Sequence, residues 1–276
     1  MIYADLHVHT NHSDGVCEIT DVLENAASNG IKTIAITDHD TINHYDEIFR
    51  EGKRLGLNII KGVEMSCYDF DVFKKVHIVA LGLGHNTPNI DKLCSHTLSC
   101  RDQYHHELIQ ELHQQGYDIN YADAKKFSKY NIVFKMNIFQ ALKEKYPQEM
   151  TKERYKQLFA SKTSKETDLK MGYIPITEGI ASIIADGGVP ILAHPCVYNN
   201  YDEIEKYVGF GLQGLEISHS RMKPIDFGLT QMYADKFNLL KSGGSDFHDP
   251  ALLKFGDFGL TERQFNEFIN KSKIAV

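Results

Sequence analysis

The 276-residue sequence predicts an α/β fold, a distorted (β/α)7 barrel of the TIM type with a helical insertion over the C-terminal face. Short apolar, β-prone runs alternate with amphipathic helical segments, which is the pattern of a parallel α/β architecture. Histidine or carboxylate residues end successive apolar runs, as in a barrel whose functional residues share one rim. A long helix-prone stretch interrupts this alternation, so we expect the barrel at 1–86 and 171–276 and the insertion at 87–170.

The barrel elements are placed by hydrophobic period and by stop residues. Ile19, Val22, Leu23, Ala26 and Ala27 recur at helical spacing, and Gly30 is a suitable C-terminal stop for that helix. In chain order the predicted strands are 2–6, 31–36, 57–63, 76–83, 189–193, 214–217 and 238–241. The predicted helices are 19–29, 43–55, 176–186, 201–208 and 224–237, with a short last helix from Thr261. Seven strands favour a seven-stranded barrel over the full eight.

The insertion begins at Thr87-Pro88, a good N-cap and N1 pair, and is polar and helix-prone. Its predicted helices are 89–115, 121–128, 136–145 and 152–161, and we expect a mobile charged loop at 161–170. The insertion either covers the barrel mouth and selects the substrate or only stabilises the fold.

Composition limits the class of protein. An apolar content of 42% and a charged content of 24% are those of an ordinary globular domain, and no apolar run could span a bilayer. The start of the chain lacks the features of a signal peptide, so we expect a cytoplasmic protein without a membrane partner. The five cysteines form no CxxC pair, which argues against a disulfide framework and a thiolate zinc site. A net charge of −7 favours a small anionic substrate or a very short oligonucleotide over duplex nucleic acid.

The segment DLHVHTNHSDG near the N-terminus indicates metal chemistry. Side chains alternate along a strand, so His7 and His9 point to the same side and offer two imidazoles to a borderline metal. One such pair is weak evidence, but similar residues end other strands. They are His39 in TDHD, Glu64 after Gly62-Val63, His194 in AHP, and Asp246 and His248 in GGSDFH.

Together, DLHVHTNHSDG, ITDHDT, GVE, AHP and GGSDFH resemble the motifs of the polymerase and histidinol phosphatase (PHP) superfamily of metal-dependent phosphoesterases. The similarity runs to about residue 255, with a divergent middle. It implies a site for two or three divalent ions, with manganese, iron and zinc all compatible with these ligands. The implied ligands of the three ions are His7, His9, Glu64 and Asp246; then Glu64, His77 and His194; then Asp14, His39 and His248.

Such a cluster suits phosphate-ester hydrolysis by a metal-bridged hydroxide. Metal ions lower the pKa of bound water and neutralise the repelling phosphate oxygens. We expect Asp246, His248 and His219 to take part in catalysis; His219 either contacts the substrate and donates a proton or supports a ligand. Of Asp38 and Asp40, one is expected to cap the next helix and the other to orient His39.

Substrate contacts are expected from the insertion. Arg101 resembles a phosphate-binding arginine of nucleotide-type members of the family, with a solvated surface charge as the alternative. The stretch VFKMNIFQAL has Lys135 and Asn137 where the family usually has Arg and His, so the match is incomplete.

The expected function is therefore hydrolysis of a small nucleotide, such as a nucleoside 3′,5′-bisphosphate, or of a short single-stranded oligonucleotide. A histidinol-phosphate phosphatase and a non-catalytic PHP module are the alternatives. The complete set of ligand residues argues against the non-catalytic alternative. An amidohydrolase-type enzyme would need a carboxylated lysine on a strand, and no lysine is suitably placed.

Overall fold

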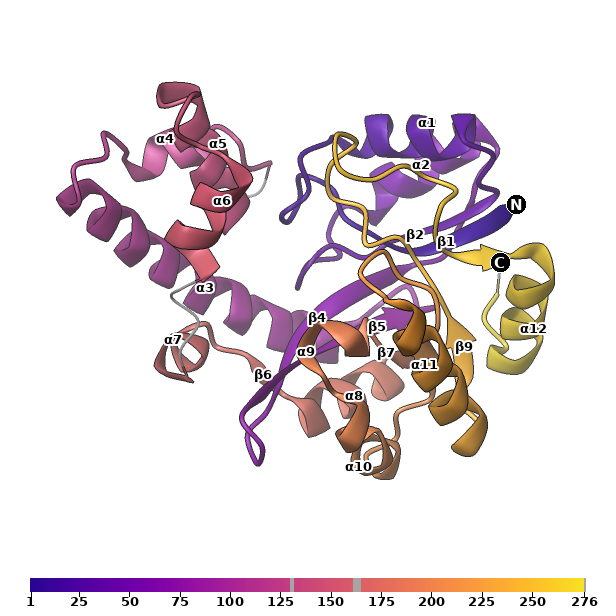
Figure 1. Ribbon diagram of the computed structural model, residues 1–276. Coiled ribbons are helices and arrows are strands. Elements are labelled where there is room, and N and C mark those ends of the chain that lie inside the picture. The colour runs from indigo at the N-terminus through magenta and orange to yellow at the C-terminus, as the bar shows by residue number, and fades with distance from the viewer. Residues whose placement is uncertain (130–131, 161–164, 276) are drawn as a thin grey trace.

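Two mixed β-sheets lie at the centre of the molecule, and helices cover them on the outside (Figure 1). The computed structural model describes residues 1–129, 132–160 and 165–275. The first sheet has the order β10-β1-β2-β3, with β1 at Ile2–Val8, β2 at Thr33–Ile36, β3 at Asn58–Ile59 and β10 at Leu260–Thr261. The second has the order β6-β4-β5-β7-β8-β9, with β4 at Gly62–Asp69, β5 at Lys74–Leu81, β6 at Ile174–Pro175, β7 at Val189–Leu192, β8 at Gly214–Glu216 and β9 at Leu240–Ser242.

Backbone contacts join the two sheets on both sides. On one side Leu6 N–H donates to Gly243 O at 3.2 Å, just after β9, and Val8 forms a bridge with Phe247. On the other side His39 forms a bridge with Glu64 of β4. The strands β1, β2, β4, β5, β7, β8 and β9 therefore follow one another around a distorted barrel.

The expected uniformly parallel order is wrong at β4 and β5. These strands form an antiparallel hairpin, and β5 is also antiparallel to β7. The predicted strand at 57–63 is divided between β3 and β4, and β4 continues to Asp69. Glu64 thus lies inside a strand that is buried along its whole length, because Met65 and Cys67 continue the strand beyond it.

Helices cover the barrel where amphipathic segments were predicted. They are α1 (Ile19–Ser28), α2 (Tyr45–Leu55), α8 (Ile176–Ala185), α9 (Pro195–Tyr198), α10 (Ile204–Gly209), α11 (Pro224–Lys236) and α12 (Glu262–Ser272), with a 3₁₀ turn at Tyr201–Glu203. Four of the five periodic apolar residues of α1 are buried, as their spacing predicted, and Ala27 is partly buried. Gly56 ends α2 in the left-handed conformation at φ 70°, which glycine adopts without a steric penalty.

The segment 87–170 is helical, as predicted. It contains α3 (Pro88–Gln114), α4 (Tyr121–Lys125), α5 (Lys135–Lys145), α6 (Lys152–Tyr155), a π-helix (Lys156–Ala160) and α7 (Lys165–Lys170). Ile90 and Cys94 of α3 pack in the barrel core, whereas Leu108 and Leu112 pack in a second core with α5. In Figure 1, α3 therefore runs from the barrel to the separate lobe of α4, α5 and α6.

The predicted loop at 161–170 is partly wrong. Residues 165–170 form α7, in which Asp168 pairs with Lys75 of β5 at 2.8 Å. The charged residues of this segment suggested a solvated loop, but one of them, Asp168, anchors α7 to the barrel. Residues 161–164 lie outside the described part of the chain.

Among the helices of the described residues, none is long and apolar enough to cross a membrane. All five cysteines are free, in agreement with their spacing.

Gly244 allows the segment after β9 to lie against β1. A Cβ atom at this position would be 2.5 Å from the backbone nitrogen of His7, which is closer than side chains approach a backbone. The close approach lets Asp246 N–H donate to His7 O at 2.9 Å, and Ser245 N–H donate to the Asp5 carboxylate at 2.9 Å. This glycine therefore fixes the position of Asp246 relative to the strand that carries His7.

We predict that Gly244→Ala lowers the free energy of unfolding by roughly 1–3 kcal/mol, because the added methyl group would meet backbone that cannot rotate away. Chemical denaturation measures the change. Gly228→Ala is the matched control: its Cβ would meet nothing within 4 Å in the middle of α11, so we expect an unchanged or slightly higher stability. Equal stability of the two variants would contradict the packing argument.

Candidate metal centre and adjoining pocket

The nine predicted ligands lie together at the rim of the barrel. Three groups have donor atoms within 4.8 Å of one another: His9, Asp14, His39 and His248; His7, His9, Glu64 and Asp246; and His39, Glu64 and His77. His194 joins the last group, since its Nε2 is 2.8 Å from Glu64 Oε1. No residue of the predicted ligand set is left outside the cluster.

Glu64 lies at the centre of this cluster. Its side chain is 1% exposed and comes from the interior of β4, so it faces the rim residues of several neighbouring strands. Both of its oxygens have imidazole neighbours. Oε2 is 3.2 Å from His7 Nε2, His9 Nε2 and His39 Nδ1, and Oε1 is 2.7 Å from His77 Nδ1 and 2.8 Å from His194 Nε2.

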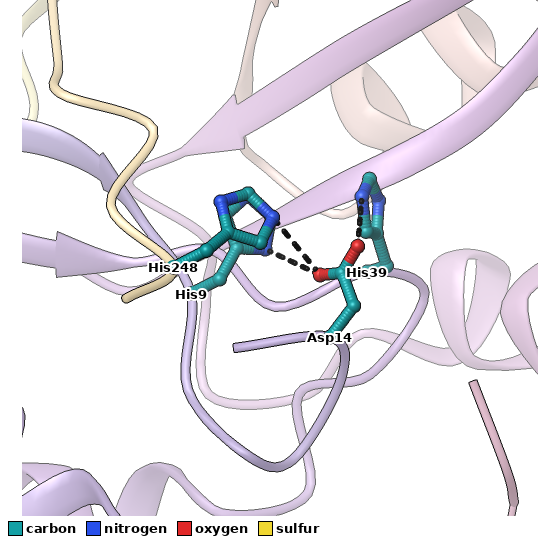
Figure 2. Close-up of side chains that lie close together, drawn as sticks. All are labelled: His9, Asp14, His39 and His248. Carbon is teal, nitrogen blue, oxygen red and sulfur yellow. Dashed lines mark ion pairs between the residues drawn. The ribbon is translucent and has the colours of Figure 1, made fainter. Parts of the chain in front are cut away.

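Asp14 gathers a second set of imidazoles (Figure 2). Its Oδ1 is 3.1 Å from His248 Nε2 and 3.6 Å from His9 Nδ1, and its Oδ2 is 3.7 Å from His39 Nε2. Asp14 and His248 are 28% and 22% exposed, whereas His9 is fully buried. This side of the cluster is therefore the one that opens to solvent.

Asp246 connects the first group to His219. Its Oδ1 is 3.2 Å from His9 Nε2, and its Oδ2 is 3.2 Å from His219 Nε2. The resemblance implied one set of ligands for each of three ions. In the structure, some of these ligands belong to more than one of the three groups. His9 and His39 each belong to two groups and so connect them.

The buried carboxylates of the cluster need positive charge close to them, as the pKa shifts of two residues show. Burial lowers the pKa of His7, but the carboxylates of Glu216 and Glu64 outweigh burial and hold that pKa well above its usual value. Burial raises the pKa of Glu64, but the surrounding imidazoles, His39 first, hold it well below its usual value. Converging carboxylates that must be neutralised fit divalent cations.

The donor set also fits a borderline metal. His7 Nε2 and His9 Nε2 lie only 3.1 Å apart and converge on the oxygens of Glu64 and Asp246. Two imidazole nitrogens that approach one another so closely beside carboxylates suit a shared cation. Mixed imidazole and carboxylate ligands are those of zinc, iron and manganese sites.

Three residues of the site have a strained backbone, as do four described residues elsewhere. Asp40, His194 and Asp246 have positive φ values of 55°, 27° and 56°. Non-glycine residues seldom adopt this region, and such residues cluster where the surrounding structure fixes a functional geometry. In each of the three, the turn directs the chain at a strand end of the cluster.

Sequence reasoning missed Glu216, the last residue of β8. Its Oε1 accepts a hydrogen bond from His7 Nδ1 at 2.7 Å, and its Oε2 accepts one from the backbone N–H of His194 at 2.6 Å. This buried carboxylate therefore orients one predicted ligand and fixes the backbone of another. Its place at a strand end, directly before the apolar Ile217, was the signal that could have identified it.

The roles expected of Asp38 and Asp40 are wrong. Asp38 accepts hydrogen bonds from the backbone and hydroxyl of Thr10 and from Ser13 Oγ, and it lies 2.9 Å from His44 Nε2. It thus fixes the loop that carries Asp14. Asp40 accepts from Ser66 N–H at 2.8 Å and pairs with Arg101 instead of orienting His39.

His219 is fully buried beneath the cluster. Arg221 N–H donates to its Nδ1 at 3.1 Å, so the ring hydrogen is on Nε2, which faces Asp246. Burial lowers the pKa of His219, which keeps the ring neutral. This geometry is that of a residue that orients Asp246, and His219 does not line the adjoining pocket.

A pocket of about 200 Å³ adjoins the cluster between the barrel and the insertion. Asp14, His39 and His77 form its inner end. The cationic residues Arg101 and Lys135 line it, as their assignment to substrate binding required. It also has residues that sequence reasoning missed: Lys75, His105, Tyr155, Tyr173 and Tyr198. Tyr198 Oη is 3.3 Å from His77 Nε2, so this tyrosine lies next to both the pocket and a predicted ligand.

Arg101 is not a solvated surface charge. It is 8% exposed, and its Nη2 donates to Asp40 Oδ2 and to Ser66 Oγ, both at 2.9 Å. The ring of Phe134 lies against the guanidinium, with its centroid 5.0 Å from the central carbon. Arg101 is thus held rigidly at the pocket.

Asn137 has a structural role in place of a substrate contact. Its Oδ1 accepts a hydrogen bond from Phe134 N–H and its Nδ2 donates to Phe127 O, both at 2.8 Å. The side chain therefore holds the start of α5 and orients the neighbouring Lys135 towards the pocket wall.

Comparisons with known proteins identify the family. The model of the PHP domain family matches residues 5–207. A phosphoribosyl 1,2-cyclic phosphate 1,2-diphosphodiesterase of Eggerthella lenta is 33% identical over 254 residues, which is 91% of this chain and 95% of that protein. A 5′-3′ exoribonuclease of Haemophilus influenzae is 28% identical over 90% of both chains. A 3′,5′-nucleoside bisphosphate phosphatase of Chromobacterium violaceum is 24% identical over 91% of this chain and 89% of that protein.

The fold is shared with a crystal structure from Bifidobacterium adolescentis that has been assigned as a metal-dependent phosphoesterase. The two chains superpose with a TM-score of 0.83 at 26% identity, over 98% of this chain and 96% of the other. The similarity therefore includes the insertion as well as the barrel.

We predict that Glu216→Gln weakens metal binding roughly 10- to 100-fold, because an uncharged amide accepts a weaker hydrogen bond from His7 and no longer raises its basicity. Calorimetric titration of the metal-stripped protein with manganese measures the change. Glu205→Gln, on the exposed side of α10, is the matched control and should bind as the wild type does. Wild-type affinity in Glu216→Gln would contradict the role of this carboxylate.

Proposed function

Because the chain belongs to the PHP domain family, we propose that it is a metal-dependent phosphoesterase whose substrate is a ribose derivative with two phosphate groups. The observation that carries the proposal is the position of the pocket. Three residues of the cluster, Asp14, His39 and His77, line it together with a buried arginine and two lysines. One end of a substrate can therefore react while the other is held.

The proposed metal ligands are the nine residues of the cluster, with two or three divalent ions. When bound, these ions lower the pKa of a water molecule and neutralise the oxygens of the reacting phosphate. The remaining work belongs to the protein. Glu64 holds five imidazoles in place, Glu216 orients His7, and His219 orients Asp246. Their burial excludes water from all sides except the pocket.

Of the three residues expected to take part in catalysis, Asp246 and His248 remain our candidates for catalytic residues. Asp246 and His248 lie on the loop that follows β9, and the hydrogen bond from Asp246 N–H to His7 O holds this loop against β1. His248 and Asp14 are the more exposed members of the cluster, and Asp14 lines the pocket. We assign His219 to positioning Asp246, because its only ring hydrogen already faces that carboxylate.

The insertion at 87–170 acts in this proposal as a cap that sets the size of the substrate. Lys135 at the start of α5 and Arg101 on α3 bind the part of the substrate that does not react, and Tyr155 and Tyr173 offer faces for a sugar or base. The volume of about 200 Å³ suits one nucleotide or sugar better than a long chain. The net charge of −7 also disfavours duplex nucleic acid.

Two substrates satisfy this description. A nucleoside 3′,5′-bisphosphate agrees with the aromatic lining, which could stack a base. A phosphoribosyl cyclic phosphate agrees with the similarity to the Eggerthella lenta enzyme. Its sequence identity of 33% exceeds the 28% and 24% of the other two relatives described above. Both place two phosphates on one ribose, so the same pocket serves either.

We predict metal-dependent release of phosphate from adenosine 3′,5′-bisphosphate or ring opening of phosphoribosyl 1,2-cyclic phosphate by manganese-loaded protein. Phosphate assay and chromatography of the products measure both. Protein treated with a metal chelator is the control. It should be inactive, because the proposed reaction requires the bound divalent ions. Preferred hydrolysis of short oligoribonucleotides or of histidinol phosphate would overturn the proposed substrate, and no activity on any phosphate ester would overturn the enzyme.

We predict that Asp246→Asn lowers kcat by at least roughly 100-fold with the fold retained, because the amide keeps the shape but loses the charge shared by His9 and His219. Steady-state kinetics measure the loss, and circular dichroism tests the fold. Asp235→Asn on the exposed face of α11 is the control and should leave kcat unchanged. Undiminished turnover in Asp246→Asn would remove this residue from the proposed machinery.

A further inference from the structure

Two buried nitrogen atoms of the pocket lining have no hydrogen-bond partner. They are Arg101 Nε and His105 Nε2, one helical turn apart on α3. Both residues line the pocket beside the cluster, and both are more than nine-tenths buried. Residues at i and i+4 face the same side of a helix, so these atoms belong to one face. Unpaired buried polar atoms are costly, which points to a missing ligand.

His105 offers an acceptor. Its Nδ1 contacts the backbone oxygen of Val133, and a carbonyl can only accept, so the ring hydrogen is on Nδ1. Burial, with the nearby Arg101, lowers the pKa of His105 to about 3. The ring is therefore neutral at physiological pH, and its Nε2 has a lone pair without a hydrogen.

Arg101 offers a donor with little free charge. Its guanidinium is paired with the fully buried carboxylate of Asp40, and Nη2 is occupied by that carboxylate and by Ser66. The pair as a whole is neutral, so Arg101 is less suited to a phosphate dianion than an unpaired arginine would be. Its buried Nε–H has no hydrogen-bond partner among the described residues, and an uncharged oxygen would satisfy it.

A neighbouring donor and acceptor of this kind match a hydroxyl group, which both accepts and donates a hydrogen bond. A phosphate oxygen would find no hydrogen on His105 Nε2 and would be repelled by its lone pair. Lys135, which lines the same pocket, is the residue suited to a phosphate. Charge and hydrogen bonding thus divide the pocket into two subsites.

We propose that Arg101 and His105 form a hydroxyl-binding subsite that selects ribose over 2-deoxyribose substrates. Arg101 Nε–H donates to the oxygen of the ribose hydroxyl, and that hydroxyl donates to His105 Nε2. The inference rests on the proposed function and, within it, on a substrate with a free 2-hydroxyl, as in a nucleoside 3′,5′-bisphosphate. In a 1,2-cyclic phosphate that oxygen is esterified and has no hydrogen to donate to His105. A deoxyribose in this position leaves both nitrogens unpaired, which is why the subsite rejects it.

The test compares adenosine 5′-monophosphate with 2′-deoxyadenosine 5′-monophosphate in calorimetric binding, and the two corresponding 3′,5′-bisphosphates in kcat/KM. We expect the wild type to favour the ribose form roughly 10- to 100-fold in both measurements. In His105→Asn the ratio should fall to about one, because the short amide can still donate to Val133 O but does not reach the position of Nε2.

Two further variants separate recognition from folding. His105→Gln places an amide oxygen near the position of Nε2 and should restore part of the preference for ribose. His106→Asn makes the same change at the adjacent, exposed histidine that stacks on Tyr121, and it should keep the wild-type ratio. Thermal unfolding of each variant identifies any loss caused by the fold alone.

The binding measurement distinguishes the two levels of the argument. Tighter binding of the ribonucleotide that is lost in His105→Asn supports the subsite even if neither bisphosphate is hydrolysed, in which case only the proposed reaction fails. Equal affinity for the two nucleotides, a ratio unchanged in His105→Asn, or no binding of either nucleotide overturns the subsite.

Discussion

The architecture of the site depends on one buried carboxylate. Glu64 is nearly inaccessible to solvent, and an isolated charge in such a place would be strongly destabilising. It is tolerated because five imidazoles from different parts of the chain surround it. The same requirement determines the barrel: His7 of β1, His39 after β2 and His194 after β7 reach one point only if their strands surround it. The imidazoles can therefore surround Glu64 only when the barrel has assembled.

Much of the barrel and of the ligand set could be predicted from the sequence, because both follow short-range patterns. The spacing of apolar residues predicted the positions of the helices. Motifs at the ends of predicted strands identified His9 and Asp246 as candidate ligands. The antiparallel hairpin of β4 and β5 could not be predicted this way, because parallel and antiparallel strands have the same side-chain alternation. Glu216 was missed because the predicted strand extended to residue 217, so the place of this glutamate at a strand end was not recognised.

The substrate pocket was the least predictable part, for a physical reason. Arg101 and Lys135 were each recognised as candidate substrate contacts. What a pocket residue can bind, however, depends on partners that are distant in the chain. Asp40, 61 residues away, neutralises Arg101, and the carbonyl of Val133 decides which nitrogen of His105 has the hydrogen. Local sequence reports which side chains are available, and the tertiary fold decides how much charge or hydrogen-bonding capacity each has left.

The sharing of α3 between two cores has a mechanical consequence. This helix of 27 residues is about 40 Å long, with Ile90 packed in the barrel and Leu112 packed in the outer lobe. Both ends of this helix are held in apolar cores, and Arg101 lies between them. A change in the distance between the outer lobe and the barrel would require α3 to bend or one of its ends to leave its core. The spacing across the pocket, which lies between the barrel and the insertion, thus depends on this single helix.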